Sequence, residues 1–166
     1  MLWRSPTLAD IERVAMKMRE DDRREIYNVI PGDYANPFAL SKFLKGVLDR
    51  GNFGCCACLD ENTPVCVLGW TELHPGVMEA WAFATDDFSK LSTPLTKFVR
   101  QQLRPSLLSN LGIHRMQAIS RHDHVQAHRW LAVLGFRQEA VLKHYGRDGS
   151  DYFMFRATRS DSQCAS

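Results

Sequence analysis

Three histidines between His122 and His128 are the first residues whose type and spacing could bind a metal. The pattern is H-x-H-x3-H, and His124 and His128, four positions apart, would share one face of a helix. No glutamate follows in the pattern of a zinc protease, and the neighbouring sequence offers no fourth ligand. We therefore interpret these histidines as residues that cap or decorate the first half of a helix, and we predict no metal site.

Four cysteines form a second set of candidate metal ligands: Cys55, Cys56, Cys58 and Cys66. The alternation of a β-strand puts Cys55 on one face and Cys56 with Cys58 on the other, which separates the ligands. We predict small buried thiols on core strands instead of a zinc cluster. With Cys164 the count is five, an odd number, and disulfide frameworks belong to small secreted chains. All five are therefore expected to be reduced.

The elements that must position these residues follow from hydrophobic periodicity and from cap and turn signals. Thr7 with Asp10 forms a capping box for a helix that we expect to run to residue 26. Asn36 begins a second helix, which ends at Gly51. Thr93 with Pro94 is the cap signal of a third helix, which is expected from residue 92 and which Pro105 should break. A fourth helix covers 122–134 and ends at Gly135.

Short apolar runs between these helices predict strands. They cover 2–4, 52–60, 64–73, 77–85, 114–120, 136–145 and 152–158, the last two joined by a tight turn at "GRDG". The predicted order, β α α β β β α β α β β, is that of an α+β fold with a mixed, mostly antiparallel sheet flanked by helices.

Length and composition predict one globular domain over residues 1–158 with a polar tail over 159–166. Of the 166 residues, 45% are hydrophobic and 24% are charged, and no apolar run is long enough for a membrane span. The N-terminus lacks the pattern of a secretory signal, so we expect the cytoplasm of the cell that makes the protein.

The net charge of +2 gives no strong nucleic-acid signal, but it is uneven. Residues 1–83 carry nine basic and twelve acidic side chains, and residues 84–166 carry twelve basic and seven acidic ones. The basic half could meet a phosphorylated ligand or an acidic partner, or it could be an ordinary solvated surface.

The predicted order of elements, with the pattern of residues 114–158, resembles the GNAT superfamily of N-acetyltransferases. Ala127, Gly135 and Phe136 fall where that family has Ala and Gly-Phe on its last helix. The stretches "WAFATDDFSKLSTPLTKFVRQQL", "HRWLAVLGF" and "HYGRDGSDYFMF" resemble, more narrowly, the acetyltransferase-like and internal virion proteins of short-tailed phages. The resemblance implies a sheet that splays between two central strands, near Ala84 and Ile119.

The resemblance also implies an acetyl-CoA site, where a glycine-rich loop at a helix N-terminus holds the pyrophosphate. In this sequence Lys90, Ser92 and Pro94 stand at the glycine positions, after Ser89. The hydroxyls and charge of residues 89–93 could still bind phosphate, or Ser92 and Thr93 could simply cap the helix. The candidate acetyl-CoA residues are Ser89, Lys90, Ser92, Thr93 and His124, of which His124 stands at the position of the family's Asn.

Catalysis in this family implies a general base on a central strand and a general acid for the leaving thiolate. Glu72 and Glu79 are the candidate bases, and either could instead face outward. Leu131 stands where the family often has the Tyr that acts as general acid, and a leucine cannot donate a proton. Tyr145 could serve as the general acid instead, but the sequence does not show whether it lies near the site.

Two functions remain open at this stage. The altered loop and Leu131 favour a phage protein with a degenerate acetyl-CoA site, associated with the virion or its assembly. Its expected partners are phage structural proteins, or further copies of itself, in the host cytoplasm or the virion. The alternative is an acetyl-CoA-dependent N-acetyltransferase acting on a small amine or a host protein.

Overall fold

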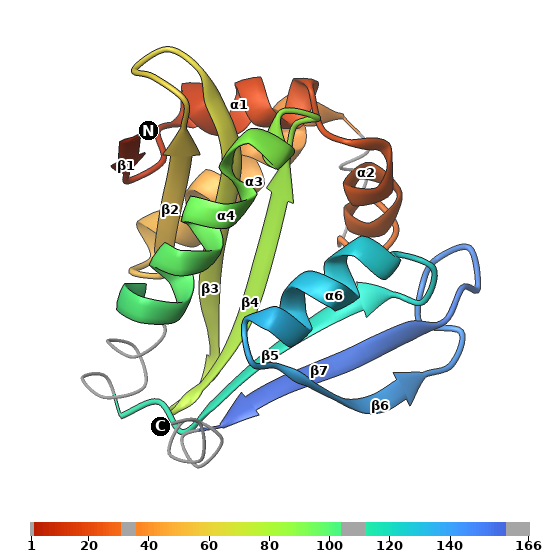
Figure 1. Ribbon diagram of the computed structural model, residues 1–166. Helices are drawn as coiled ribbons and strands as arrows, with labels where there is room; N and C mark the ends of the chain where they lie inside the picture. Colours follow the sequence, from red (N-terminus) through yellow and green to blue (C-terminus); the bar gives the residue numbers. More distant parts are fainter. Residues whose placement is uncertain (1, 31–35, 104–111, 159–166) are drawn as a thin grey trace. The chain divides into compact units, whose positions relative to one another are not determined.

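The computed structural model describes residues 2–30, 36–103 and 112–158, whose strands form one seven-stranded sheet of order β1-β2-β3-β4-β5-β7-β6 (Figure 1). The strands are β1 (Leu2–Arg4), β2 (Phe53–Cys58), β3 (Pro64–His74), β4 (Val77–Ala84), β5 (Arg115–Arg121), β6 (Arg137–Leu142) and β7 (Tyr152–Thr158). The helices are α1 (Leu8–Met16), α2 (Glu20–Ile26), α3 (Pro37–Asp49), α4 (Phe88–Phe98) and α6 (Val125–Val133), with a π-helix at Val99–Leu103. β4 pairs with β5 in parallel, while β1–β2, β2–β3, β5–β7 and β6–β7 are antiparallel. The predicted α+β class with a mixed, mostly antiparallel sheet is confirmed.

The chain divides into two compact units with cores of their own. Unit 1 comprises residues 1–71 and 81–93, and unit 2 comprises residues 72–80 and 94–166. The division falls inside β3, β4 and α4, so each of these elements contributes residues to both units. Residues 104–111 and the predicted tail over 159–166 lie outside the described residues, and so does the predicted break at Pro105.

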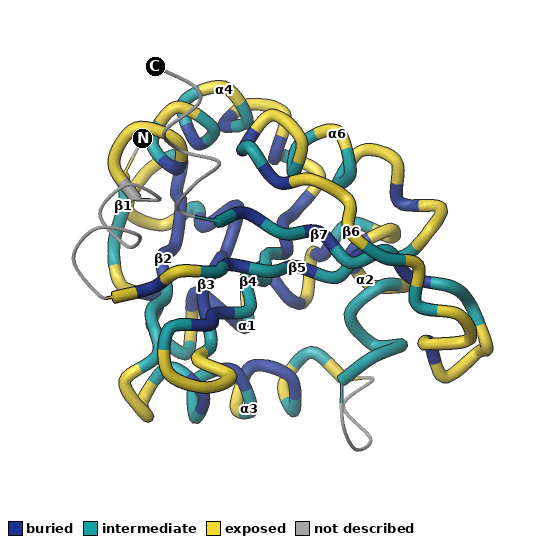
Figure 2. The backbone as a smooth tube through the Cα atoms, turned by 90° about the horizontal axis from the view of Figure 1, so that it is seen from below, coloured by how far each residue is buried: buried dark blue, intermediate teal, exposed yellow. Residues whose placement is uncertain are grey.

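Unit 1 is built on β1, β2, β3 and the second half of β4, and α1 and α3 lie together on one side of β2 and β3 (Figure 2). Its core includes Ile11, Val14, Leu40, Leu44, Cys56, Cys58, Val67 and Phe83. Local signals predicted both helix starts correctly. Thr7 and Asp10 form a complete capping box, and the Asn36 side chain accepts hydrogen bonds from the N–H groups of Phe38 and Ala39.

The single helix predicted over residues 7–26 is wrong, because the chain leaves the helix between α1 and α2. Met18 forms a β-bridge with Thr85, and the Arg19 N–H donates to the Ala84 carbonyl at 2.9 Å. The Asp22 carboxylate, which is paired with Arg19, accepts from the Ala84 N–H at 2.8 Å. These backbone groups bond to the end of β4, so they cannot also continue a helix.

The predicted start of the third helix at residue 92 is also wrong. α4 begins at Phe88, whose N–H donates to the Thr85 carbonyl at 3.0 Å. Ser92 and Thr93 therefore lie inside the helix, and so does Pro94. Phe88, Leu91 and Leu95 are buried at helical spacing, and this apolar stripe explains the earlier start.

Unit 2 is built on the first half of β4 with β5, β7 and β6, and α6 runs over β5 and β7 (Figure 1). The ring of His128 on α6 lies 5.2 Å from each of the rings of Phe153 and Phe155. Gly135 ends α6 as predicted, at a φ of 86°. The N–H groups of Gly135 and Phe136 donate to the carbonyls of Ala132 and Leu131, which completes a Schellman motif.

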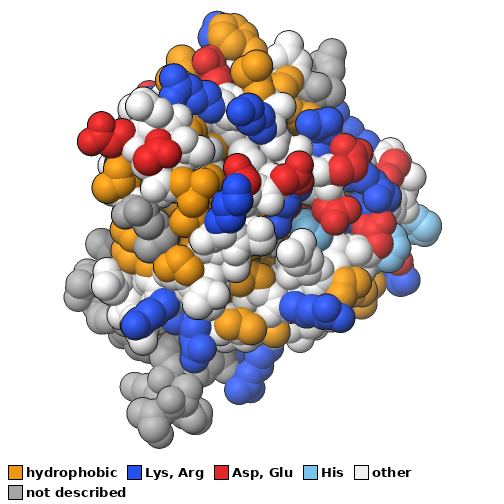
Figure 3. Space-filling model, turned by 45° about the horizontal axis from the view of Figure 1, so that its top comes forward, with side chains coloured by type: hydrophobic (Ala, Val, Ile, Leu, Met, Phe, Trp, Pro, Cys, Tyr) orange, Lys and Arg blue, Asp and Glu red, His pale blue; other side chains and the backbone are white. Residues whose placement is uncertain are grey.

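The tight turn predicted at "GRDG" is present, because the Gly149 N–H donates to the Gly146 carbonyl at 2.8 Å. The strands beside it are shorter than predicted, since β6 ends at Leu142 and residues 143–151 connect it to β7. His144 has a φ of 53°, and its N–H donates to the Asp151 carboxylate at 3.0 Å. Lys143 pairs with the same carboxylate at 2.7 Å. Side chains of both charges and histidines gather at the right-hand edge of the molecule, where this connection lies (Figure 3). The Asp151 contacts hold the longer connection in a defined shape.

None of the helices among the described residues combines the length and apolar character that a bilayer crossing requires.

Candidate active site

Glu79 is the last residue of the parallel pairing between β4 and β5. The pairs are Val77 with Arg115, Met78 with Met116, and Glu79 with Gln117. Both strands continue beyond this point, β4 to Ala84 and β5 to Arg121. The resemblance implied a splay near Ala84 and Ile119, but among the described residues the ladder already ends at Glu79. This carboxylate therefore lies where the two strands cease to hydrogen-bond to each other.

The environment of Glu79 suits a general base. Burial raises the pKa of its carboxyl group, and a hydrogen bond from the Gln117 side chain lowers it in part, so that the net pKa is above the ordinary value of 4.5. Burial disfavours the charged form, whereas a donor aimed at the carboxylate favours it. A carboxylate with a raised pKa holds an accepted proton more firmly and works closer to neutral pH.

Tyr145, from the connection between β6 and β7, lies close enough to Glu79 to sense its charge. Burial and then the negative charge of Glu79 raise the pKa of the Tyr145 phenol. Its ring lies 5.5 Å from the ring of the fully buried Tyr152, at an interplanar angle of 55°. Unit 2 thus brings together a carboxylate, an amide and a phenol that are far apart in sequence. We refer to Glu79, Gln117 and Tyr145 as the Glu79 cluster.

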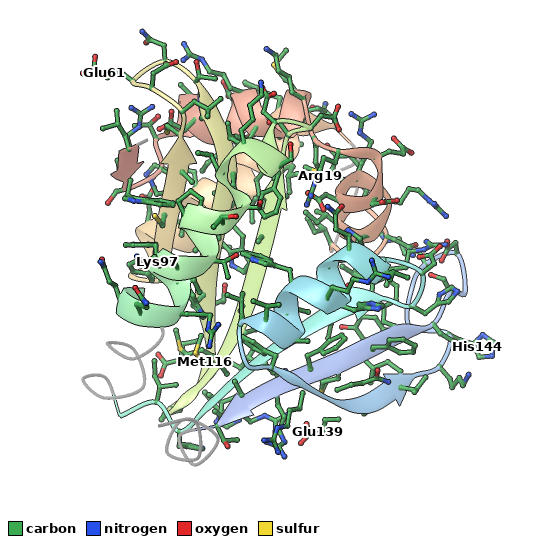
Figure 4. The ribbon with its side chains drawn as sticks, viewed as in Figure 1. Arg19, Glu61, Lys97, Met116, Glu139 and His144 are labelled. Atoms are coloured by element: carbon green, nitrogen blue, oxygen red, sulfur yellow. The ribbon has the colours of Figure 1, made fainter. Side chains whose placement is uncertain are left out.

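A chain of polar contacts that the sequence gave no reason to expect supports this cluster. The Arg115 Nε–H donates to Gln117 Oε1 at 3.2 Å, and the Arg115 guanidinium also donates to Glu139, at 3.1 Å from one of its nitrogens. Arg156 Nε lies 3.1 Å from Glu139 Oε1. Figure 4 labels Glu139, which lies on the side of β7 away from α6. The only signal in the sequence was the alternation that puts Arg115 and Gln117 on one face of a strand.

The other candidate base, Glu72, also belongs to unit 2. It is exposed on the last part of β3, among exposed neighbours. Glu79, in contrast, is partly buried.

The histidines make contacts of a structural kind. His124 is the N-cap residue of α6 and is only 5% exposed. His128 Nε2 lies 2.9 Å from the Arg121 carbonyl oxygen, and His122 Nδ1 lies 3.1 Å from that of Asp151. Among the described residues, no group of His, Cys, Asp and Glu is arranged to hold a metal ion. A contact between His124 and acetyl-CoA stays a prediction.

The four cysteines of unit 1 are free and buried, as predicted. Cys56 and Cys58 share one face of β2, with their sulfur atoms 3.6 Å apart. Burial raises the pKa of the Cys55 thiol to about 11 and also raises that of Cys66. The Cys55 and Cys66 thiols are therefore protonated and act as small apolar side chains.

Residues 85–93 of unit 1 do not fit the pyrophosphate grip that the resemblance implies. The N–H groups of Phe88 and Lys90 already donate to the carbonyls of Thr85 and Asp87 at 3.0 Å. Lys90 Nζ pairs with Asp87 at 2.6 Å, and Asp86 adds a further carboxylate beside the helix N-terminus, where a phosphate would carry its own negative charge. Only the buried Thr85 hydroxyl, which has no hydrogen-bond partner within the described segments, suits a polar ligand.

The individual candidate residues for acetyl-CoA on α4 also show no arrangement for binding phosphate. Ser92 Oγ donates to the carbonyl of Ser89 at 3.1 Å, one helical turn back. Ser89 and Thr93 are exposed. The role of Ser89, Lys90, Ser92 and Thr93 in binding acetyl-CoA stays a prediction.

Several basic residues of the second half of the chain are paired with carboxylates in the described residues of unit 2. Arg115 and Arg156 pair with Glu139, and Arg121 pairs with Asp123 and Asp148. These pairs agree better with a solvated surface of mixed charge than with a site for a large anion.

Comparison with known proteins shows a likeness in structure and none in sequence. No protein-family model matches the chain, and no curated protein matches its sequence. A ribosomal-protein-alanine N-acetyltransferase from Brucella melitensis superposes with a TM-score of 0.68 at 14% identity, over 95% of this chain and 99% of that one. A spermidine N-acetyltransferase from Vibrio cholerae gives 0.70 at 12% identity, over 98% and 97%. A GNAT-superfamily phosphinothricin acetyltransferase from Sinorhizobium meliloti, solved with acetyl-CoA, gives 0.69 at 14%, over 95% and 87%.

At these identities the likeness establishes the fold: the chain has the GNAT fold that the sequence predicted. None of the three descriptions bears on a phage origin, so the narrower resemblance stays a prediction.

Proposed function

We propose that this protein is an N-acyltransferase in which Glu79 removes a proton from the acceptor amine. The observation that carries the proposal is the position and state of Glu79: a partly buried carboxyl with a raised pKa, at the last pair of the β4–β5 ladder and beside Tyr145. The similar structures support this hypothesis over the virion or assembly role that the sequence favoured, because their descriptions are those of acetyltransferases.

The proposed proton transfer follows from the charge state of amines. An ammonium group has no lone pair, so it must lose a proton before its nitrogen can attack an acyl carbon. Glu79 in its ionised form accepts that proton, and its raised pKa makes the transfer less unfavourable. Tyr145 supplies an O–H donor in the same cluster. Leu131, at the position where the family often has a Tyr, has no such donor.

Acetyl-CoA is the acyl donor to test first, because a similar structure was solved with it. Residues 85–93 do not provide the family's grip on pyrophosphate, and the proposal assigns them no step in the reaction. If the donor binds, the melting temperature will rise with its concentration. No rise at millimolar acetyl-CoA would count against acetyl-CoA as the donor.

The decisive experiment compares Glu79→Gln with Glu72→Gln. Purified protein is mixed with acetyl-CoA and an amine panel that includes spermidine and a peptide with N-terminal alanine, and released thiol is followed. Losing a general base should lower kcat by roughly 10²- to 10⁴-fold in Glu79→Gln. Glu72→Gln should keep wild-type activity, because Glu72 is exposed on the last part of β3. Equal activity in wild type and Glu79→Gln would refute the assignment, provided that both melt as folded proteins.

A further inference from the structure

Gln117 connects Glu79 to a group of charged residues on the same face of the unit 2 sheet. It is the direct neighbour of Glu79 in the parallel pairing and of Arg156 in the antiparallel pairing with β7. Direct neighbours in a sheet project to the same face, so Glu79, Gln117 and Arg156 share one side of the sheet. α6 covers the other side, where the rings of Phe153 and Phe155 meet His128.

The orientation of the Gln117 amide is fixed by chemistry. Arg115 Nε–H, 3.2 Å away, can only donate, so the atom that faces it must be the amide oxygen. The NH₂ group of Gln117 is then turned to the other side, where it donates to the Glu79 carboxylate. An amide is often ambiguous between oxygen and nitrogen, but an arginine on one side removes that ambiguity.

Glu139 holds Arg115 in place. Both terminal nitrogens of Arg115 donate to the Glu139 carboxylate, one of them at 3.1 Å, and Arg156 Nε approaches the same carboxylate at 3.1 Å. A fork of two parallel bonds fixes the plane of a guanidinium better than a single contact does. The sequence of contacts therefore runs from Glu139 through Arg115 and Gln117 to Glu79, across β6, β5 and β4.

We propose that Gln117, held by Arg115 and Glu139, is a positioning residue that orients the Glu79 carboxylate toward the acceptor amine. This inference rests on the proposed function, because it assigns Glu79 the role of base. Among the described residues of unit 2, Gln117 acts on Glu79 directly, and Arg115 from β5, Glu139 from β6 and Arg156 from β7 act through Gln117. Tyr145 faces Glu79 from the β6–β7 connection and is neutral in the pH range where a carboxyl group titrates.

Removing the amide donor should change both rate and titration. In Gln117→Leu the Glu79 carboxylate loses its hydrogen bond, so its protonated form gains relative to the ionised one. At neutral pH, kcat/KM should fall by roughly tenfold, a modest part of what a general base contributes. The deficit should narrow as the pH rises, because Glu79 then ionises without help. Arg115→Met frees the amide to rotate and should give a smaller change in the same direction.

The test measures the titration of Glu79 directly, by NMR of protein labelled with ¹³C at glutamate side-chain carboxyls, with Glu79→Gln used to assign the signal. Gln117→Leu should move the Glu79 titration to higher pH. Gln138→Leu is the matched control, since it makes the same exchange at an exposed position on β6 and should leave the titration in place. A purely structural role would lower activity without moving the titration.

The two proposals fail in different ways. An unchanged Glu79 titration in a folded Gln117→Leu protein overturns the positioning role, whatever the activity. A wild-type protein that transfers no acetyl group to any amine overturns the proposed function, while the titration still reports whether Gln117 acts on Glu79.

Discussion

The raised pKa of Glu79 links the candidate base to the stability of the protein. Burial, opposed in part by Gln117, places its pKa in the folded state above the ordinary value of 4.5. Between these two values the folded state binds the proton more tightly than the unfolded chain does. The free energy of unfolding therefore decreases as the pH rises from about 4.5 through the pKa of the folded state. The proposed base therefore lowers the stability of the folded protein once its carboxyl group is ionised.

Glu79→Gln should remove this pH dependence. The variant is expected to be at least as stable as the wild type at neutral pH, and its advantage should shrink as the pH falls toward 4.5, where the wild-type carboxyl becomes protonated in both states. Urea unfolding at a series of pH values measures the difference. Glu72→Gln, at an exposed position, serves as the control for replacing a glutamate. Parallel curves for Glu79→Gln and the wild type would show that the raised pKa of Glu79 is wrong.

At the scale of the element, the sequence predicted the helix ends that depend on neighbouring residues and missed the features that depend on distant ones. The capping box at Thr7 and the glycine end at Gly135 depend on a few neighbouring residues, and the sequence predicted both. The break between α1 and α2 depends on Ala84, more than 60 residues away, and was missed. The pairing of Glu79 with Gln117 likewise depends on a parallel register that no local pattern specifies. Glu79 could therefore be named from the sequence, but its supporting contacts could not.

Gly69 in β3 shows how a single strand position can constrain packing. A Cβ at this position would lie 2.3 Å from Trp81 Cζ2 and 2.8 Å from the Phe53 carbonyl oxygen. The Trp81 ring is held by a hydrogen bond from its Nε1 to Thr71 Oγ1 at 3.1 Å, so it cannot move away freely. Gly69→Ala should lower the free energy of unfolding by about 1–3 kcal/mol, as overpacking does elsewhere.

Gly54→Ala in β2 is the matched control for this substitution. There the nearest atoms are the side-chain tips of Leu48, at 2.6 and 3.1 Å, and Pro6 Cγ at 3.2 Å. A leucine side chain can adjust its rotamer, so the loss should be smaller than at Gly69. Denaturant unfolding of both variants measures the two losses of stability. A larger loss in Gly54→Ala than in Gly69→Ala would contradict the packing around Trp81.

At the scale of the whole molecule, the division of β4 and α4 between the two units predicts cooperative unfolding. Unit 2 contains residues 77–80 of β4 and 94–98 of α4, and unit 1 contains the remainder of both. If one unit unfolds its part of β4, the strand is cut short for the other unit as well. We therefore expect one transition, although each unit has its own buried side chains.

The buried thiols provide a probe of this cooperativity, because Cys55, Cys56, Cys58 and Cys66 all lie in unit 1. In a Cys164→Ser variant, which removes the cysteine outside the described residues, a thiol reagent should find no rapidly reacting group in the native protein. The four thiols should become reactive at the same urea concentration at which circular dichroism reports loss of the sheet and helices of both units. Thiols that react at a clearly lower urea concentration would mean that unit 1 opens alone, and the shared strand would then not couple the two units.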